Sequence, residues 1–112
     1  MHVEYRVLLG VALSLALASV SLVETARAAG PAPAQARMCA NCHGEDGIAV
    51  VPGAANLAGQ QKEYLIEQLR AFRAGRRQNP QMSVVAKPLT DEDIEELSDW
   101  YSSIRITVEK RK

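Results

Sequence analysis

Hydrophobic residues recur with a helical period in two parts of the chain. In the first, Leu65, Leu69 and Phe72 fall at positions i, i+4 and i+7 of the stretch from residue 60 to 74. Gly75 follows at the place where a glycine commonly ends a helix. The sequence therefore predicts a helix over residues 60–74.

The second periodic stretch starts after Thr90, which is predicted to cap the helix. Three acidic residues occupy the first turn, residues 91–93, where their negative charge interacts favourably with the positive end of the helix dipole and stabilises the helix. The predicted inward face carries Ile94, Leu97, Tyr101 and Ile104. Trp100 falls at the margin of that face and is expected either to pack against the N-terminal segment or to belong to a contact surface.

The segments between these helices are predicted to be loops. Residues 44–59 contain four glycines and one proline, and residues 76–88 are mostly polar. A brief helical turn is expected near Ala34, running into the two cysteines. The sequence shows no alternation typical of strands, so we expect an all-α domain with long loops.

An apolar block near the N-terminus predicts export. Residues 7–23 hold no charge, Arg6 precedes them, and Ala26 and Ala28 stand where a signal peptidase reads small residues. We expect residues 1–28 to be a cleaved signal peptide, and residues 29–112 to be one domain with a charged tail from about residue 105. The alternative is a retained membrane anchor. A helix of these seventeen residues would be roughly 25 Å long, which is shorter than the ~30 Å hydrocarbon core but could span it if the bilayer thins locally.

Composition limits what the exported domain can be. Of its 84 residues, 11 are basic (13 less Arg6 and Arg27) and 11 acidic (13 less Glu4 and Glu24). Such a balance argues against a nucleic-acid binder. So small an exported domain usually needs a disulfide, a metal or a bound cofactor to complete its core.

The segment Cys39-Ala40-Asn41-Cys42-His43 spells C-x-x-C-H, the attachment sequence for c-type haem. Two thiols at this spacing reach the two vinyl groups of one porphyrin, and the adjacent histidine supplies an axial ligand. Two other interpretations of the cysteines fit less well. A redox-active dithiol would be accompanied by a thioredoxin-like βαβ pattern, which the sequence lacks, and a disulfide that closes so short a loop would stabilise the fold little. A zinc site lacks further ligands, because the only other histidine, His2, lies in the leader.

The second axial ligand can be sought among the soft donors that remain. Met38 directly precedes Cys39, so it is held on the same face of the haem as His43 and could hardly reach the opposite face. Met82 lies 39 residues beyond His43, in a loop stiffened by Pro80. Met82 is therefore the expected ligand. The alternatives are a core-filling role for Met82 and ligation by Lys87, whose hydrated amine binds iron poorly until it is deprotonated.

The stretch from Met38 to Ser103 resembles the small class I cytochromes c of bacteria, especially the cytochrome c4 and c553 type, and the haem subunits of that type in periplasmic dehydrogenases. The matching segments are CANCHGEDG, NLAGQ, YLIEQLRAFRAGRR, NPQM and LTDEDIEELSDWYSS. The resemblance implies three to four helices wrapped round one covalently attached haem c, with Cys39 and Cys42 as thioether anchors and His43 and Met82 as axial ligands. It also implies that the N-terminal and C-terminal helices cross beside the haem.

Two features depart from that pattern. Ala55 stands where relatives commonly carry a proline whose carbonyl accepts a hydrogen bond from the ligand histidine. Cytochrome c4 proper is a tandem of two domains, whereas this chain has one haem motif and length for one domain.

The expected function is periplasmic electron transfer, with no enzymatic activity of its own. The haem would cycle between Fe(III) and Fe(II) while the protein accepts electrons from a dehydrogenase or a quinol complex such as cytochrome bc1, and donates them to an oxidase or reductase. The alternatives are a haem subunit bound permanently to a periplasmic dehydrogenase, such as a flavocytochrome, and a five-coordinate haem enzyme or gas sensor. No stable membrane insertion is expected after cleavage.

Charge is unevenly distributed along the two main helices. Six of the nine residues from 91 to 99 are acidic, and a basic cluster is formed by Arg70, Arg73, Arg76 and Arg77. These charges either serve solubility alone or orient the domain on a charged redox partner.

Overall fold

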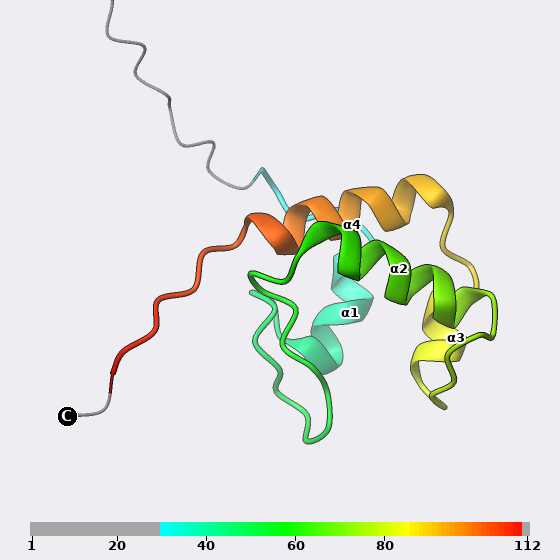
Figure 1. Cartoon of the computed structure of the whole chain (residues 1–112), viewed down its shortest axis with the longest axis horizontal. Helices are drawn as coiled ribbons and strands as arrows, with labels where there is room; N and C mark the ends of the chain where they lie inside the picture. Colours follow the sequence, from blue (N-terminus) through cyan, green and yellow to red (C-terminus); the bar gives the residue numbers. More distant parts are fainter. Residues whose placement is uncertain (1–29, 111–112) are drawn as a thin grey trace, which may run out of the picture.

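A computed structural model describes residues 30–110, which form four helices joined by loops (Figure 1). The helices are α1 (Ala36–His43), α2 (Lys62–Arg73), α3 (Met82–Ala86) and α4 (Asp91–Ser103). No strand occurs within residues 30–110, which confirms the predicted all-α class. The predicted signal segment, residues 1–28, lies outside the described residues.

The helices α2 and α4 occur where their patterns predicted them. Leu65 and Phe72 on α2 are buried, and Gly75 adopts a φ of 74° just beyond the helix. On α4 the Thr90 hydroxyl accepts a hydrogen bond from the Asp93 backbone N–H, and the Asp93 carboxylate accepts one from the Thr90 N–H. This reciprocal pair satisfies two backbone donors that the first turn of the helix leaves free.

The prediction that residues 76–88 form a loop throughout was wrong at one place. They contain α3, which starts where the Asn79 side-chain oxygen accepts hydrogen bonds from the N–H groups of Gln81 and Met82. Ala86 at the end of α3 is fully buried in the core. A side-chain cap and tertiary packing thus stabilise a helix too short to be seen as a periodic pattern.

The core lies between α2 and α4, which run side by side (Figure 1). The predicted inward face of α4 is confirmed: Ile94, Leu97 and Tyr101 are at most 2% exposed, and Ile104 packs partly buried against them. Ala36 belongs to the same buried cluster. The Gln35 side chain, directly before α1, donates a hydrogen bond to the Asp93 carboxylate of α4, and Figure 1 shows α1 running across the direction of α4.

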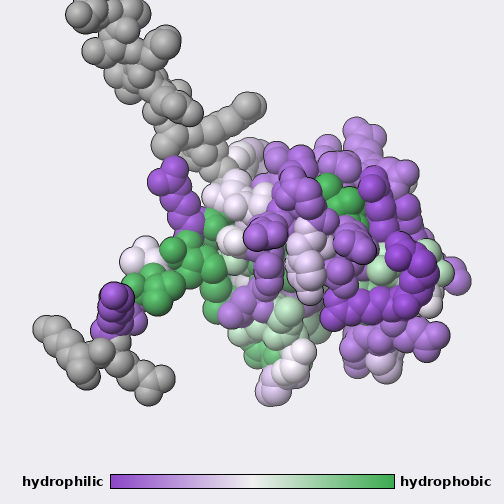
Figure 2. All heavy atoms as spheres, in the orientation of Figure 1, coloured by the Kyte–Doolittle hydropathy of each residue, from purple (hydrophilic) through white to green (hydrophobic). Residues whose placement is uncertain are grey.

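Hydrophilic side chains cover the outer face of α2 and α4 (Figure 2). Arg70 pairs with Asp91 and Glu95, and Arg73 pairs with Asp91 at 2.6 Å. Exposed pairs of this kind stabilise a fold by about 0–1 kcal/mol each. Half of the basic cluster is therefore neutralised by the acidic helix beside it, which weakens the charge separation expected from the sequence.

Beyond α4 the chain continues as an extended tail, as expected from about residue 105 (Figure 1). Near the start of the tail, the Ile106 side chain lies against the backbone at Gly59. Across residues 30–110 the helices are each too short or too polar to traverse a bilayer.

Candidate haem site

A cavity of about 550 Å³ opens between the four helices and the loop of residues 51–57. Its volume lies in the range of about 300–1,000 Å³ that is typical of ligand and cofactor pockets. The four residues predicted to bind the cofactor, Cys39, Cys42, His43 and Met82, all line it. The fold thus brings together the one motif of α1 and a methionine that lies far away in the sequence.

The helix α1 presents three of these residues on one face. Cys39, Cys42 and His43 stand at i, i+3 and i+4, positions that neighbour one another on a helix surface. Both thiols are free, and the Cys39 sulfur donates to the Gln35 carbonyl at 3.6 Å. Burial raises the pKa of the Cys39 thiol, so the group is neutral and packed rather than activated.

His43 is buried, and its ring is fixed by one short contact. Its Nδ1 lies 2.6 Å from the Ala55 carbonyl oxygen. A carbonyl only accepts, so Nδ1 carries the proton and Nε2 holds the lone pair of the ring. This is the tautomer that a metal-ligating histidine needs, with the outer contact that orients such ligands. The contact forms with alanine at position 55, so the ring of a proline is not required for it.

The loop that carries Ala55 is held against the end of α1. The Gly47 carbonyl accepts hydrogen bonds from the N–H groups of Leu57 and Ala58, at 2.8 and 3.1 Å. The Asn56 side-chain oxygen accepts from the Ala49 N–H at 2.8 Å. Hydrogen bonds therefore hold the irregular, glycine-rich loop of residues 44–59 in place, and the loop positions the Ala55 carbonyl beside His43.

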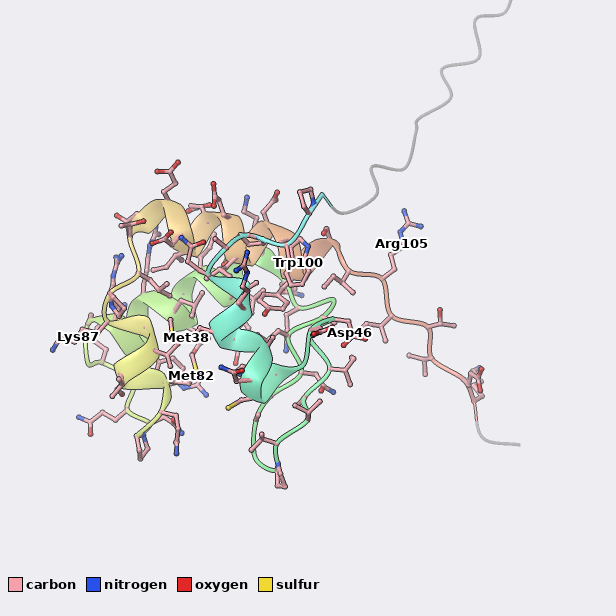
Figure 3. The ribbon with its side chains drawn as sticks, turned by 180° about the vertical axis from the view of Figure 1, so that it is seen from behind. Met38, Asp46, Met82, Lys87, Trp100 and Arg105 are labelled. Carbon is pink, nitrogen blue, oxygen red and sulfur yellow. The ribbon has the colours of Figure 1, made fainter. Side chains whose placement is uncertain are left out.

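Met82 is the first residue of α3, and Asn79 sets its position. The Asn79 side-chain oxygen lies 2.9 Å from the Met82 backbone nitrogen. Figure 3 shows Met38 and Met82 in the space between α1 and α3, while Lys87 points outward. Met38 also lines the cavity, although it is 46% exposed. Lys87 is exposed and absent from the cavity wall, which argues against it as a ligand.

Three residues of α4 complete the wall, and sequence reasoning assigned none of them to the site. Leu97 and Tyr101 were predicted only as core, and Ser98 was not singled out. The Ser98 and Tyr101 hydroxyls are buried without a hydrogen-bond partner among residues 30–110. The sequence offered one signal for this part of the site, because Ser98 is a polar residue directly beside the apolar face of α4. Asn79 was also missed, although asparagine before proline is a frequent turn signal.

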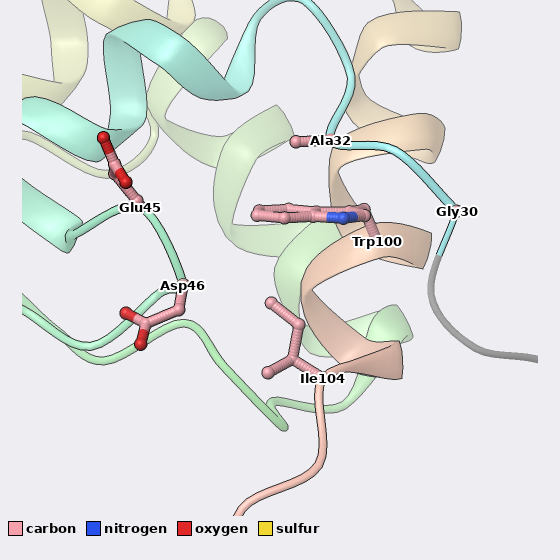
Figure 4. Close-up of a pocket in the computed structure, with 6 residues that line it drawn as sticks. All are labelled: Gly30, Ala32, Glu45, Asp46, Trp100 and Ile104. Carbon is pink, nitrogen blue, oxygen red and sulfur yellow. The ribbon is translucent and has the colours of Figure 1, made fainter.

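A second hollow lies on the surface, away from the cavity. It is lined by Trp100 and Ile104 of the C-terminal region, by Ala32, and by the acidic pair Glu45 and Asp46. Figure 4 shows the Trp100 ring beneath the segment that carries Ala32. Trp100 therefore lies beside the N-terminal segment, and it also lines a hollow that is open to the surface.

The residues around the cavity fit haem c. Two neighbouring thiols on one helix suit thioether attachment, an oriented imidazole suits iron, and a thioether sulfur suits the same metal as a soft ligand. The cavity of about 550 Å³ that these residues surround has room for a large prosthetic group.

Comparisons with known proteins agree with this chemistry. The sequence profile of the cytochrome c family matches residues 28–104. Cytochrome c4 of Pseudomonas aeruginosa is 32% identical over 88% of this chain and 49% of its own length. A thiosulfate dehydrogenase electron acceptor of Thiomonas intermedia is 40% identical over 66% of this chain and 35% of its own.

A solved structure supports the fold as well. Cytochrome c4 of Acidithiobacillus ferrooxidans matches with a TM-score of 0.56 and 38% identity, over 59% of this chain and 38% of that one. The chain thus spans between a third and a half of the length of these relatives. The haem-attachment motif, the helical fold and the family match together show that the chain belongs to the cytochrome c family, as a c4-like class I c-type cytochrome.

Proposed function

We propose that the protein is an electron carrier with one haem c, attached through Cys39 and Cys42 and ligated by His43 and Met82. The observation that carries this proposal is the 2.6 Å contact from His43 Nδ1 to the Ala55 carbonyl. It supports ligation because it leaves Nε2 as the one lone pair of a buried imidazole in the wall of the cavity.

The haem, when bound, supplies one-electron exchange between Fe(III) and Fe(II). The chain's own residues hold and shield it. His43 and Met82 would occupy both axial positions, which leaves no position for a substrate and argues for a carrier rather than an enzyme. A thioether ligand favours the reduced form of the iron. Leu97 and Tyr101, at 1% and 2% exposure, keep water from that side of the cavity.

The mouth of the cavity supports contact with a redox partner. Met38, Val51 and Tyr64 line the cavity and are each more than 40% exposed. An apolar rim of this kind suits brief docking of another protein close to the cofactor. The partners we propose are a dehydrogenase or quinol complex on one side and a terminal acceptor on the other.

The proposed location is the periplasm. Its support is the uncharged block of residues 7–23, followed by small residues at 26 and 28, which is typical of a secretory signal. A retained signal would tether the same domain to the membrane. N-terminal sequencing of the purified protein distinguishes these outcomes, because cleavage after Ala28 leaves Ala29 as the first residue.

A second candidate is a haem subunit bound permanently to one dehydrogenase. The Thiomonas relative, which is named as an acceptor for thiosulfate dehydrogenase, is the observation that favours it. Purification of the protein from its native source separates the two. A carrier elutes alone, whereas a subunit co-elutes with its dehydrogenase in constant ratio.

The test of ligation compares the two methionines of the cavity wall. We expect the oxidised protein to show the weak red absorption band of a sulfur–iron bond and to resist carbon monoxide when reduced. The substitution M82A should abolish the band and admit carbon monoxide, whereas M38A should keep the band. A wild-type protein that binds carbon monoxide at once would overturn the carrier proposal and favour a five-coordinate enzyme or sensor.

A further inference from the structure

The extended tail after α4 has the composition of a β-strand. Residues 104–108 read Ile-Arg-Ile-Thr-Val, in which four of five side chains are β-branched. Apolar and polar residues alternate, so Ile104, Ile106 and Val108 share one face when the backbone is extended. This tail lies beyond residue 104, where the match to the cytochrome c family ends.

The structure leaves this strand-like segment exposed. Ile106 is 54% exposed and Val108 is 83% exposed. Within the described part of the chain, no backbone hydrogen bond is formed by residues 105–110. Figure 2 shows hydrophobic atoms where the tail leaves the domain, apart from the hydrophilic surface of the helices. An extended edge of this kind is a template for pairing with another strand.

We propose that residues 104–110 pair antiparallel with the same residues of a second copy of this chain. In this ribbon Thr107 faces its own counterpart. Arg105 then faces Glu109 of the second copy, and Ile106 faces Val108 of the second copy. The two-fold symmetry repeats each contact, which gives two ion pairs and two apolar pairs around a central threonine pair, with Ile104 opposite Lys110 at each end.

The charge pattern selects both the register and the occupant. If the ribbon were centred on Ile106 instead, Arg105 would face Thr107 and both ion pairs would be lost. A shift by one residue would place apolar side chains opposite polar ones along the whole ribbon. Only the register centred on Thr107 sets Arg105 opposite Glu109, and this self-complementary charge is why we commit to a second copy rather than to the sheet of another protein.

The domain gives the ribbon one point of support. The Ile106 side chain lies against the backbone at Gly59, where an added Cβ would come within 3.0 Å of it. Two strands alone are only marginally stable in water. We therefore expect a weak dimer whose population rises with protein concentration and falls with salt, because its ion pairs are solvent-exposed. The proposal does not depend on how the haem is ligated.

Charge reversal tests the register directly. Sedimentation velocity of the haem-loaded full chain, followed at 280 nm, should show a concentration-dependent dimer for the wild type. R105E or E109R alone would set like charges opposite each other twice and should abolish it. The double variant R105E/E109R should restore it. An equimolar mixture of the two single variants should also dimerise, because each then offers the charge that the other lacks.

Cysteine crosslinking tests the centre of the ribbon. Directly opposed residues in antiparallel strands have Cα atoms about 4.5–5.5 Å apart, within the range that a disulfide spans. T107C should therefore crosslink at least roughly tenfold faster than the matched variant R105C. The two copies of residue 105 would lie about 14 Å apart, because four residues at about 3.4 Å each separate them along the strands.

Three outcomes would overturn the proposal. The first is a wild-type chain that stays monomeric at every concentration. The second is a dimer that survives both single charge reversals, which would place the interface elsewhere. The third is equal crosslinking of T107C and R105C, which would indicate random collision. None of these bears on the ligation of the iron, which the methionine variants test separately.

Discussion

Among alanine substitutions at the glycines of residues 30–110, Gly44→Ala is expected to cause the most severe collision. Gly44 directly follows His43, and its N–H donates to the Ala40 carbonyl at 3.0 Å to close α1. Its φ of 78° and ψ of 156° fall in a region that glycine alone adopts readily. An alanine Cβ there would lie 2.0 Å from the carbonyl oxygen of Ile48, far inside contact distance.

The expected loss can be divided into two parts. The backbone conformation costs an alanine about 1–3 kcal/mol, offset by about 0.4–1 kcal/mol because alanine restricts the unfolded chain. Relief of the collision then requires the loop after α1 to shift, because the obstacle is backbone. Overpacking of this kind adds typically about 1–3 kcal/mol. We therefore expect G44A to lower the free energy of unfolding by about 1–6 kcal/mol.

Gly75 provides the control, because it carries the backbone cost without a collision. Its φ is 74°, no atom lies within 4 Å of an added Cβ, and it lies outside the cavity wall. The substitution G75A should therefore cost only the backbone part, about 0–3 kcal/mol. The difference between the two variants measures the collision at Ile48.

The assay is guanidinium unfolding of the haem-loaded proteins, followed by helical circular dichroism. Equal unfolding free energies for G44A and G75A would refute the reasoning, because the collision would then cost nothing. If G44A fails to mature while G75A carries haem normally, the collision is too large for the domain to absorb. That result supports the same conclusion, since the two variants differ mainly in the space around the new methyl group.

Three further predictions concern α4. Leu97→Ala should lower the unfolding free energy by about 2–5 kcal/mol, because its side chain is 1% exposed; thermal melting checks this. The pKa of the Asp93 carboxyl lies below its usual range, because the group interacts with the backbone N–H of Thr90, the Thr90 hydroxyl and the side-chain amide of Gln35. The carboxylate therefore adds stability that is present above the unfolded pKa of about 3.9 and is lost as pH falls through the lower folded value. Urea midpoints measured between pH 6 and 2 should drop less steeply for Asp93→Asn than for wild type. Tyr101→Phe should change the free energy of unfolding by less than about 1 kcal/mol, because the buried Tyr101 hydroxyl has no hydrogen-bond partner among residues 30–110. A larger loss of stability, measured by denaturant titration, would show that the hydroxyl is hydrogen-bonded when haem is present.

The sequence by itself determined the elements whose signals are local. The α4 cap at Thr90 and the glycine after α2 are short-range features, and both occur as predicted. The haem motif is equally local, because its three residues share one face of a short helix wherever that helix lies. Apolar period alone placed Leu97 and Tyr101 in the core.

Only the tertiary structure decided what depends on contacts between distant residues. The hydrogen bond from His43 to Ala55 needs the loop between them to fold back, which spacing does not reveal. The helix α3 was missed because five residues carry no readable period, and the Asn79 side chain and the burial of Ala86 stabilise it instead. Local preferences thus fix where the helices lie along the chain, whereas packing and long-range hydrogen bonds decide which side chains meet in the cavity.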